Sequence, residues 1–309
     1  MSGSKTCTFV IPNYNGADLL QQYLPGVIAE AAGCDVVVVD DCSMDGSVDL
    51  LRQSFPACKV IAQEVNRGFS VSANAGIGAC DSEFVVLLNN DVAVTPGFLD
   101  AMVPLFEDAS VFAVSPRIIL PAKGNIDEGC KTGFWHHGMF NVDQRQDVKE
   151  VTPVLYACGC AAVYRRSMLE ELGGFDEAYS PFYWEDADLG YRAWKRGWKS
   201  LYQPASTVYH IHAASTGRLA QSYTGAIKAC NSLLFMWRNI EDAGLLSAHR
   251  RWLPMVLLRR AAAGDQPFLV GWKEAYSRRR EAVEARQRES AYRKLSDREI
   301  MQIAGVDCR

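Results

Sequence analysis

Acidic residues stand at two places in this sequence where their surroundings suit ligand binding or proton transfer. Asp91 ends the run 89–91, directly after an apolar stretch, so it belongs to a polar segment at the end of a predicted strand. Glu185 and Asp186 follow an aromatic segment, residues 179–184. Aromatic side chains can form an apolar wall that raises a carboxyl pKa toward that of a general base. The structural alternative is that the carboxylates only stabilise the start of a helix through its dipole.

Histidine and cysteine are the other candidate ligands. In the run 210–212 (HIH), strand alternation places the two histidine rings on opposite sides, so they cannot both face one metal ion without a bend. A lone histidine is more often structural. The ten cysteines are scattered, and the one close pair, Cys158 and Cys160, lacks the spacing and the second pair of a zinc site. We therefore expect reduced core cysteines, as in a cytoplasmic protein.

Four apolar runs that are typical of buried parallel strands must position the polar residues. These runs cover residues 7–11, 36–39, 59–63 and 84–88. Each is followed, directly or within a few residues, by polar and turn-forming residues: 12–15, 40–47, 66–68 and 89–91. Any one of these segments is explained as a turn, but all four together predict a ligand site, because ligands bind beyond the carboxyl ends of parallel strands.

Helical spacing between the strands completes an α/β alternation over the first 115 residues. Helices are predicted over 19–32, 47–55, 70–80 and 96–106, the last with Thr95 as N-cap and Pro96 at the first helical position, and a fifth strand over 111–115. Residues 116–152 lose the alternation and are expected to form an irregular excursion or a hairpin. The remaining elements are a strand (160–164), two helices (167–172, 186–196), two short strands (199–202, 207–210) and helices from 220 onward.

Composition narrows the function classes. The chain has 309 residues, 49% of them hydrophobic, and a net charge of −4, as expected for a folded protein. We find no apolar run of about 18 residues and no secretory signal, so a cytoplasmic location is expected. The sequence also lacks the glycine fingerprint of dinucleotide-binding folds, the phosphate loop of nucleotide hydrolases and the serine of a nucleophile elbow.

Charge is unevenly distributed along the chain. Residues 250–309 contain 14 basic and 8 acidic residues, whereas residues 1–249 contain 18 and 28. The basic part has two interpretations: helices that pack on the domain or form a homodimer contact, or a peripheral anchor on an anionic membrane. Nucleic acid is not expected as a partner, because the rest of the chain is acidic.

Five motifs, in order, resemble those of the family 2 glycosyltransferases and, within that family, the bacterial rhamnosyltransferase-like branch. They are VDDCSMDGS (39–47), NRGF (66–69), LNND (88–91), GGFD (173–176) and EDADL (185–189). The likeness covers about residues 6–217 and implies a GT-A fold, an α/β architecture with a mostly parallel central sheet flanked by helices. It divides the chain into a transferase domain, 1–217, and a C-terminal helical extension, 218–309. Within the domain, residues 1–115 would bind the nucleotide sugar and residues 116–217 would hold the acceptor and the catalytic groups.

The resemblance implies a role for each matching residue. Pro12 and Tyr14 would border the nucleobase and ribose, and Asp41 or Asp40 would hydrogen-bond the base. The whole implied donor-binding set is Pro12, Tyr14, Asn15, Asp40, Asp41, Ser43, Asn66, Arg67, Gly68, Asn74, Asn89 and Asn90. The other implied roles are catalytic base for Asp186, with Glu185 as the next choice, metal ligand for Asp91 and His210, and acceptor contact for Tyr183, Trp184 and Asp188.

The implied activity is inverting, metal-dependent sugar transfer in cell-surface polysaccharide synthesis. The donor would be a nucleotide-diphospho-sugar, dTDP-rhamnose or a UDP-sugar, and the acceptor a hydroxyl of a glycan or a lipid-linked molecule, which would bring the enzyme to the inner face of the membrane. Asn89 departs from the family pattern, because it replaces the first Asp of the Asp-x-Asp motif that binds Mg²⁺ or Mn²⁺. Two alternatives stay open: a nucleotide-sugar-binding protein that does not transfer or only hydrolyses the donor, and a nucleotidyltransferase on a similar sheet.

Overall fold

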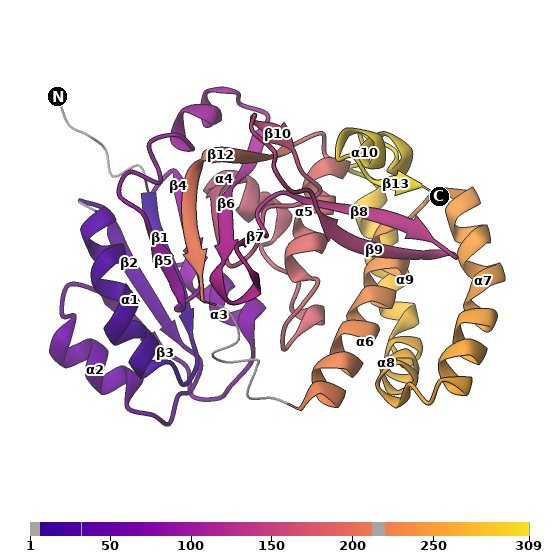
Figure 1. Ribbon diagram of the computed structural model, residues 1–309, viewed down its shortest axis with the longest axis horizontal. Coiled ribbons are helices and arrows are strands. Elements are labelled where there is room, and N and C mark those ends of the chain that lie inside the picture. Colours follow the sequence, from indigo (N-terminus) through magenta and orange to yellow (C-terminus); the bar gives the residue numbers. More distant parts are fainter. Residues whose placement is uncertain (1–6, 32, 212–219, 309) are drawn as a thin grey trace.

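The computed structural model describes residues 7–31, 33–211 and 220–308 (Figure 1). Its N-terminal part alternates strands and helices as the apolar pattern predicts. The elements are β1 (Cys7–Asn13), α1 (Ala17–Glu30), β2 (Asp35–Asp40), α2 (Ser47–Ser54), β3 (Lys59–Ala62), α3 (Phe69–Ile77) and β4 (Phe84–Leu88). The β-branched run 36–39 is buried throughout, because helices cover both faces of a parallel sheet.

The C-terminal half of the sheet has a different topology. Its strands are β5 (Val92–Val94), β6 (Val111–Leu120), β7 (Ile126–Asp127), β10 (Thr152–Pro153), β11 (Ala161–Arg165) and β12 (Lys199–His210). The strand order is β10-β12-β6-β11-β4-β1-β2-β3. Strands β1 to β4 pair in parallel, but β11 is antiparallel to both β4 and β6, so the sheet is mixed. One long strand, β12, replaces the two short strands predicted there, with an irregularity between Gln203 and Thr207.

Residues 96–106 do not form the predicted α-helix. The Thr95 hydroxyl donates a hydrogen bond to the carbonyl of Thr207 on β12 (2.6 Å) instead of capping a helix. Gly97 has a φ of 71°, which a right-handed helix excludes. Only a short 3₁₀ helix, η1 (Val103–Glu107), forms. The helix prediction was wrong because a tertiary bond to β12 outweighs the local capping sequence.

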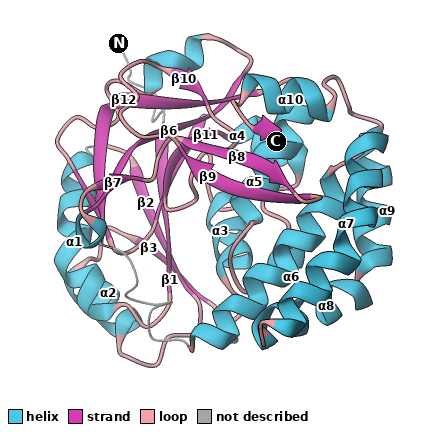
Figure 2. Cartoon of the chain, turned by 45° about the vertical axis from the view of Figure 1, so that its right-hand side comes forward, coloured by secondary structure: helices cyan, strands magenta, loops and turns pink. Residues whose placement is uncertain are grey.

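The 116–152 excursion contains a hairpin, one of the two forms expected. The hairpin strands are β8 (Lys131–His136) and β9 (Met139–Gln144), and β13 (Asp307–Cys308) adds to β8 in parallel. The remaining helices are α4 (Arg166–Leu172), η2 (Pro121–Lys123), η3 (Glu177–Tyr179), α5 (Glu185–Lys195), α6 (Gln221–Asn239), α7 (Ala243–Ala262), α8 (Gln266–Ser277), α9 (Arg279–Ser290) and α10 (Asp297–Ile303). Figure 2 shows α6, α7 and α8 grouped on one side of the molecule, and α6 and α7 contact β9 of the hairpin.

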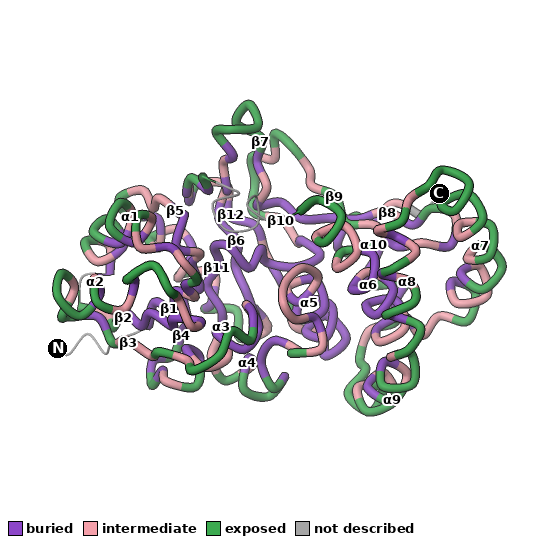
Figure 3. The backbone as a smooth tube through the Cα atoms, turned by 90° about the horizontal axis from the view of Figure 1, so that it is seen from below, coloured by how far each residue is buried: buried purple, intermediate pink, exposed green. Residues whose placement is uncertain are grey.

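The C-terminal helices share one hydrophobic core with the hairpin and α5. Phe140, Tyr191, Phe235 and Ile300 are all fully buried in it. The basic segment is also tied down by polar contacts, since the Asp297 carboxylate lies 2.7 Å from the Lys195 ammonium. Figure 3 shows the buried residues along the strands and α5, with exposed residues on the outer faces of α2, α7 and α9. None of the helices in the described part of the chain is long and apolar enough to cross a membrane.

Candidate active site

A cavity of about 1000 Å³ lies at the carboxyl ends of β1, β2 and β4 and extends to α6, α7 and α8. It brings together most of the residues that the sequence singles out. The predicted residues that line it are Pro12, Tyr14, Asp41, Asn66, Gly68, Asn89, Asn90, Asp91, Tyr183, Trp184, Glu185, Asp186 and His210. The four polar strand ends therefore meet in one place, as the α/β alternation predicts.

Asp41 fixes the loop that follows β3 against the end of β2. Its two carboxylate oxygens accept hydrogen bonds from the backbone N–H groups of Arg67 (2.9 Å) and Gly68 (2.8 Å). Gly68 has a φ of 89°, and a Cβ there would lie 2.6 Å from the carbonyl oxygen of Pro181. Only glycine lets the loop approach residue 181 this closely. Asp41 thus shapes the cavity wall, and its contact with a nucleobase stays a prediction.

Asp91 and His210 lie side by side because of strand pairing. The register of β5 and β12 places His210 opposite Val92, the residue after Asp91. His210 Nε2 is 3.2 Å from Asp91 Oδ1, and both side chains are buried. Burial alone lowers the pKa of His210, but the carboxylates of Asp91 and Glu128 outweigh it and raise that pKa to about 9. This histidine is therefore an imidazolium near neutral pH, held by the carboxylates that surround it.

Glu128 and Lys131 are site residues that the sequence analysis missed. Both line the cavity, and the Lys131 ammonium pairs with Glu128 Oε1 at 3.1 Å. Glu128 Oε2 lies 3.5 Å from His210 Nδ1. Burial disfavours the charge of Lys131, but the surrounding acidic groups hold its pKa well above the ordinary lysine value. The cavity wall thus carries a lysine that stays protonated within an ion pair with Glu128, and its ammonium can donate hydrogen bonds to a ligand with phosphate groups.

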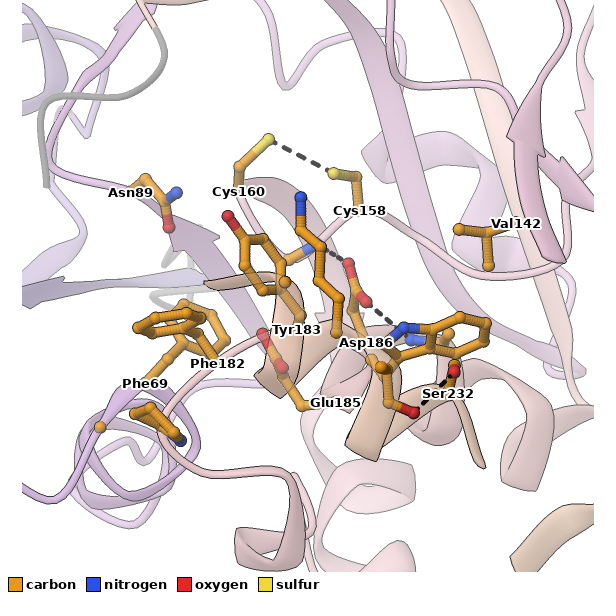
Figure 4. A pocket seen from close by; sticks show the side chains of 18 of the residues that line it. Phe69, Asn89, Val142, Cys158, Cys160, Phe182, Tyr183, Glu185, Asp186 and Ser232 are labelled. Atoms are coloured by element: carbon orange, nitrogen blue, oxygen red, sulfur yellow. Dashed lines mark hydrogen bonds between the residues drawn. The ribbon is translucent and has the colours of Figure 1, made fainter. Parts of the chain in front are cut away.

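Asp186 and Glu185 begin α5 and face the cavity together (Figure 4). Asp186 Oδ2 accepts a hydrogen bond from the Gly159 N–H (3.1 Å), and Oδ1 accepts one from the Ala187 N–H (2.8 Å). Burial raises the pKa of Asp186 despite these bonds. Burial and the neighbouring Asp186 charge raise the pKa of Glu185 well above its ordinary value. Asp186 is the less buried of the two and is held in a fixed orientation, so it is the better placed to take a proton from a bound molecule.

The aromatic segment before α5 is held in a strained conformation. Tyr183 and Trp184 have φ values of 75° and 78°, which bulky residues rarely adopt. Asn231 on α6 stabilises this turn, since its amide donates to the carbonyls of Tyr179 (2.8 Å), Phe182 (3.1 Å) and Tyr183 (2.9 Å). The turn presents both rings to the cavity, where they can contact a sugar or an apolar chain.

Several predicted donor-binding residues do not line the cavity and instead hold its loops. Asp40 is buried and accepts hydrogen bonds from Asn13 Nδ2 (2.8 Å) and the Ser43 N–H (2.9 Å). The Ser43 hydroxyl in turn accepts from the Asn15 N–H (2.8 Å). The polar atoms of Asp40, Asn15 and Ser43 join the turn after β1 to the turn after β2, and their direct contact with the donor stays a prediction.

Arg67, Asn74 and Asp188 also make their polar contacts within the fold. The Arg67 guanidinium points outward and pairs with Glu177 (3.2 Å). The Asn74 amide bonds both the N–H and the carbonyl of Phe175 (2.8 Å each), which joins α3 to the GGFD turn. Asp188 has no exposed surface and pairs with Arg192 (2.7 Å), so it cannot contact an acceptor. His212 and the predicted boundary at residue 217 lie outside the described residues.

The described cysteines are all free thiols, as predicted, and most are buried. Cys158 and Cys160 differ from the others because both line the cavity, with their sulfur atoms 3.4 Å apart. The prediction that they are only core residues was therefore incomplete. The sequence shows that the two cysteines are two residues apart, but the carboxylate beside them belongs to Glu128, which lies in a different segment.

The mixed α/β sheet with helices on its faces and a cavity at the strand ends is a GT-A fold. Two solved structures share this fold. GalNAc-T7 with UDP, GalNAc and Mn²⁺ matches with a TM-score of 0.68 and 17% identity, over 98% of this chain and 57% of that one. The mannosyltransferase PcManGT of Pyrobaculum calidifontis with GDP-Man and Mn²⁺ matches with a TM-score of 0.56 and 18% identity, over 93% and 85%.

Sequence comparison gives the family. Residues 8–173, more than half of the chain, match the model of glycosyl transferase family 2, so this chain belongs to that family and is a glycosyltransferase. It is 29% identical over 246 residues to the N-acetylglucosaminyl-diphospho-decaprenol L-rhamnosyltransferase of Mycobacterium tuberculosis, covering 70% of this chain and 80% of that one. It is 25% identical over 269 residues to the O-antigen chain rhamnosyltransferase WbaN of Salmonella anatum, covering 81% and 84%.

Proposed function

We propose that this glycosyltransferase transfers rhamnose, or a related sugar, from a nucleoside-diphosphate donor to a hydroxyl of a lipid-linked glycan, with inversion at the anomeric carbon. The observation that carries the proposal is that Asp186 faces the same cavity as the strand-end residues and the Asp91–His210 pair. The similarity to two rhamnosyltransferases supports the sugar. One of these relatives is named for a diphospho-decaprenol acceptor, which supports the acceptor class.

Asp186 acts as the general base in this proposal. Its carboxylate removes a proton from the acceptor hydroxyl while the oxygen attacks the anomeric carbon from the face opposite the departing diphosphate. The raised pKa of Asp186 favours this transfer, because a carboxylate that is more basic in the cavity takes a proton more readily. Lys131 holds its positive charge on the same cavity wall and attracts the phosphates.

The residues present fit a divalent cation with few protein ligands. Asp91 would supply an oxygen ligand, and His210 would supply a nitrogen ligand once the cation displaces its Nε2 proton; these two atoms lie 3.2 Å apart in a buried part of the cavity. Asn89 lines the same cavity and adds an amide oxygen without charge. When bound, Mg²⁺ or Mn²⁺ would neutralise charge on the leaving diphosphate. With only two protein ligands and one negative charge among them, the affinity for the cation would depend on the bound donor.

The test of this function is a thermal-shift and transfer experiment on the full chain. The chain is mixed with dTDP, UDP or GDP, each with and without Mn²⁺, and the unfolding temperature is measured. We expect one nucleotide to raise it only weakly alone and strongly with Mn²⁺. The preferred nucleotide sugar is then incubated with a polyprenyl-diphosphate-linked N-acetylglucosamine, and the anomeric configuration of the product is determined by NMR. Retention of configuration, or donor hydrolysis without transfer, would refute the proposal.

For membrane contact we propose the outer face of α7 rather than the whole basic segment. Residues 278–298 are held against the domain, whereas Met255 and Leu258 on α7 are 46% and 64% exposed. Residues 243–262 contain four arginines and no acidic residue. Val256 and Arg260 of the same helix line the cavity. An apolar and cationic helix at the cavity mouth would bring the active site to an anionic bilayer that holds the acceptor.

A matched pair of substitutions tests the α7 contact. Met255→Glu introduces a charge on the outer face of α7, and Met44→Glu introduces the same charge at a 92% exposed methionine in the turn between β2 and α2. We expect sedimentation with vesicles of 30% anionic lipid to fall for Met255→Glu and to stay at the level of the unmodified chain for Met44→Glu. Equal sedimentation of the two variants would reject this surface.

A further inference from the structure

Three potential metal ligands converge on the inner wall of the cavity at a point that the proposed mechanism does not use. They are Glu128, Cys158 and Cys160, whose ligand atoms all lie within 4.8 Å of one another. The two sulfurs are 3.4 Å apart and point toward each other in Figure 4. Both thiols are buried, and Glu128 Oε2 is shielded from solvent with His210 Nδ1 as its neighbour at 3.5 Å. The cluster therefore combines two buried thiols with a carboxylate oxygen inside the cavity.

The backbone holds the two thiols in this position before any ion binds. The Ala161 N–H donates to the Cys158 carbonyl (3.1 Å), which closes a turn over residues 158–161. β11 begins at Ala161 and fixes the end of that turn in the sheet. A preformed pair of sulfur ligands reduces the ordering cost of binding an ion.

The donor set selects a different kind of cation from the Asp91–His210 pair. Thiolates favour borderline and soft ions such as Zn²⁺, whereas Mg²⁺ and Mn²⁺ favour oxygen ligands. Two sulfurs and one carboxylate oxygen leave one position of a tetrahedral Zn²⁺ ion for a water molecule or a ligand from the cavity. The Glu128–Cys158–Cys160 cluster thus supplies three of the four ligands of a zinc ion, as sites with an open position do.

Charge balance also permits a divalent cation at this buried point. With both thiols protonated, the negative charge of Glu128 is balanced by Lys131, which lies 3.1 Å from it. A Zn²⁺ ion that displaces the two thiol protons adds two positive charges, and the two thiolates add two negative ones. The exchange leaves the net charge unchanged, so it avoids the cost of burying an uncompensated charge.

We propose that Glu128, Cys158 and Cys160 bind Zn²⁺, and that the bound ion inhibits sugar transfer. The inhibition rests on the proposed function and follows from two contacts in the structure. Glu128 Oε2 lies 3.5 Å from His210 Nδ1, and a zinc ion draws this carboxylate toward the sulfurs. Gly159 lies between the two cysteines and donates its N–H to the Asp186 carboxylate. Zinc coordination at residues 158 and 160 therefore shifts the backbone N–H that orients the general base.

Cobalt binding to the full chain tests the site independently of activity. Co²⁺ replaces Zn²⁺ in thiolate sites and gives a sulfur-to-metal charge-transfer band in the near ultraviolet. We expect the unmodified chain to bind one Co²⁺ with this band, and Zn²⁺ but not excess Mg²⁺ to abolish it. The Cys158→Ser/Cys160→Ser variant should lose the band. The control is Cys230→Ser, a buried cysteine of the helical core, which should keep it.

The remaining outcomes separate the two parts of the proposal. A band that persists in the double variant, or is absent from the unmodified chain, overturns the site. Circular dichroism shows whether the double variant folds, and the single variant Cys160→Ala replaces it if it does not. In a transfer assay with saturating Mn²⁺, half-inhibition by Zn²⁺ should need at least tenfold more zinc in Cys160→Ala than in Cys230→Ser. Zinc binding with no inhibition overturns the regulatory part alone.

Discussion

Replacing Asp186 by Asn tests the assignment of the general base most directly. The substitution keeps the size of the side chain and removes the group that takes the proton. Loss of a general base lowers turnover about 10²–10⁴-fold, which corresponds to about 3–5 kcal/mol in the barrier. Asn can still accept one of the two backbone N–H bonds that Asp186 accepts, so the free energy of unfolding should change by only about 1 kcal/mol. Donor binding should be unaffected.

Glu185→Gln is the matched control, because the two carboxyl groups are neighbours in one cavity. Burial raises the pKa of Glu185 well above the ordinary value of 4.5, so this carboxyl group binds its proton more tightly in the fold than in the unfolded chain. Its contribution to stability is therefore fully present below pH 4.5 and is lost as the pH rises toward its raised pKa in the fold, by about 1.4 kcal/mol per pH unit. Gln does not titrate, so the Glu185→Gln variant should become more stable than the unmodified enzyme as the pH rises. Its turnover should stay within tenfold of that of the unmodified enzyme.

The assays are steady-state transfer kinetics, donor binding by calorimetry and urea unfolding between pH 4 and 8. Normal turnover of Asp186→Asn with collapse of Glu185→Gln would move the base to Glu185. If both variants turned over normally, the whole assignment of α5 as the catalytic element would be refuted. A pH-independent stability difference for Glu185→Gln would show that this carboxyl group is ionised in the fold.

The other predictions concern the cation and the core. Asp91→Ala should abolish transfer and Mn²⁺-dependent nucleotide binding, whereas Asn89→Ala should only weaken both; full activity of Asp91→Ala would remove Asp91 from the metal site. Arg192→Met removes the nearer of the two cations beside the buried Asp188 carboxylate and leaves Arg238 Nε 3.9 Å away, so urea unfolding should show a loss of about 3 kcal/mol, the lower end for breaking a buried pair. A loss below 1 kcal/mol would mean that Arg238 compensates the buried charge by itself. Chelation by EDTA should stop transfer, and Mn²⁺ should restore it.

Sequence reasoning located the site where chain periodicity determines geometry. Asp41, Asn66 and Asp91 are far apart along the chain, but the α/β alternation places all three at one edge of the sheet. The same reasoning could not separate Asp41, which lines the cavity, from Asp40, which binds Asn13 inside the fold. Adjacent residues at a strand end point in different directions, and the conformation of the turn that follows decides which of them faces the cavity.

Glu128 and Lys131 show the limit of the approach. They lie in a segment with no strand periodicity, and they reach the cavity only because the chain after β6 returns toward it before the hairpin begins. Asp188 shows the opposite error. Its place in an acidic motif suggested a ligand contact, but it is one helical turn from Arg192, and this i,i+4 spacing allowed the buried pair that the structure contains.

The pairing of β13 with β8 has a consequence for how the enzyme is made. Residues 297–308 complete the hydrophobic core that supports the hairpin, and the hairpin begins with Lys131 in the cavity wall. Because the ribosome delivers the chain from its N-terminal end, the donor half can fold long before this last contact is available. The nascent polypeptide should therefore acquire nucleotide affinity during translation and catalytic competence only after residue 308 has left the exit tunnel.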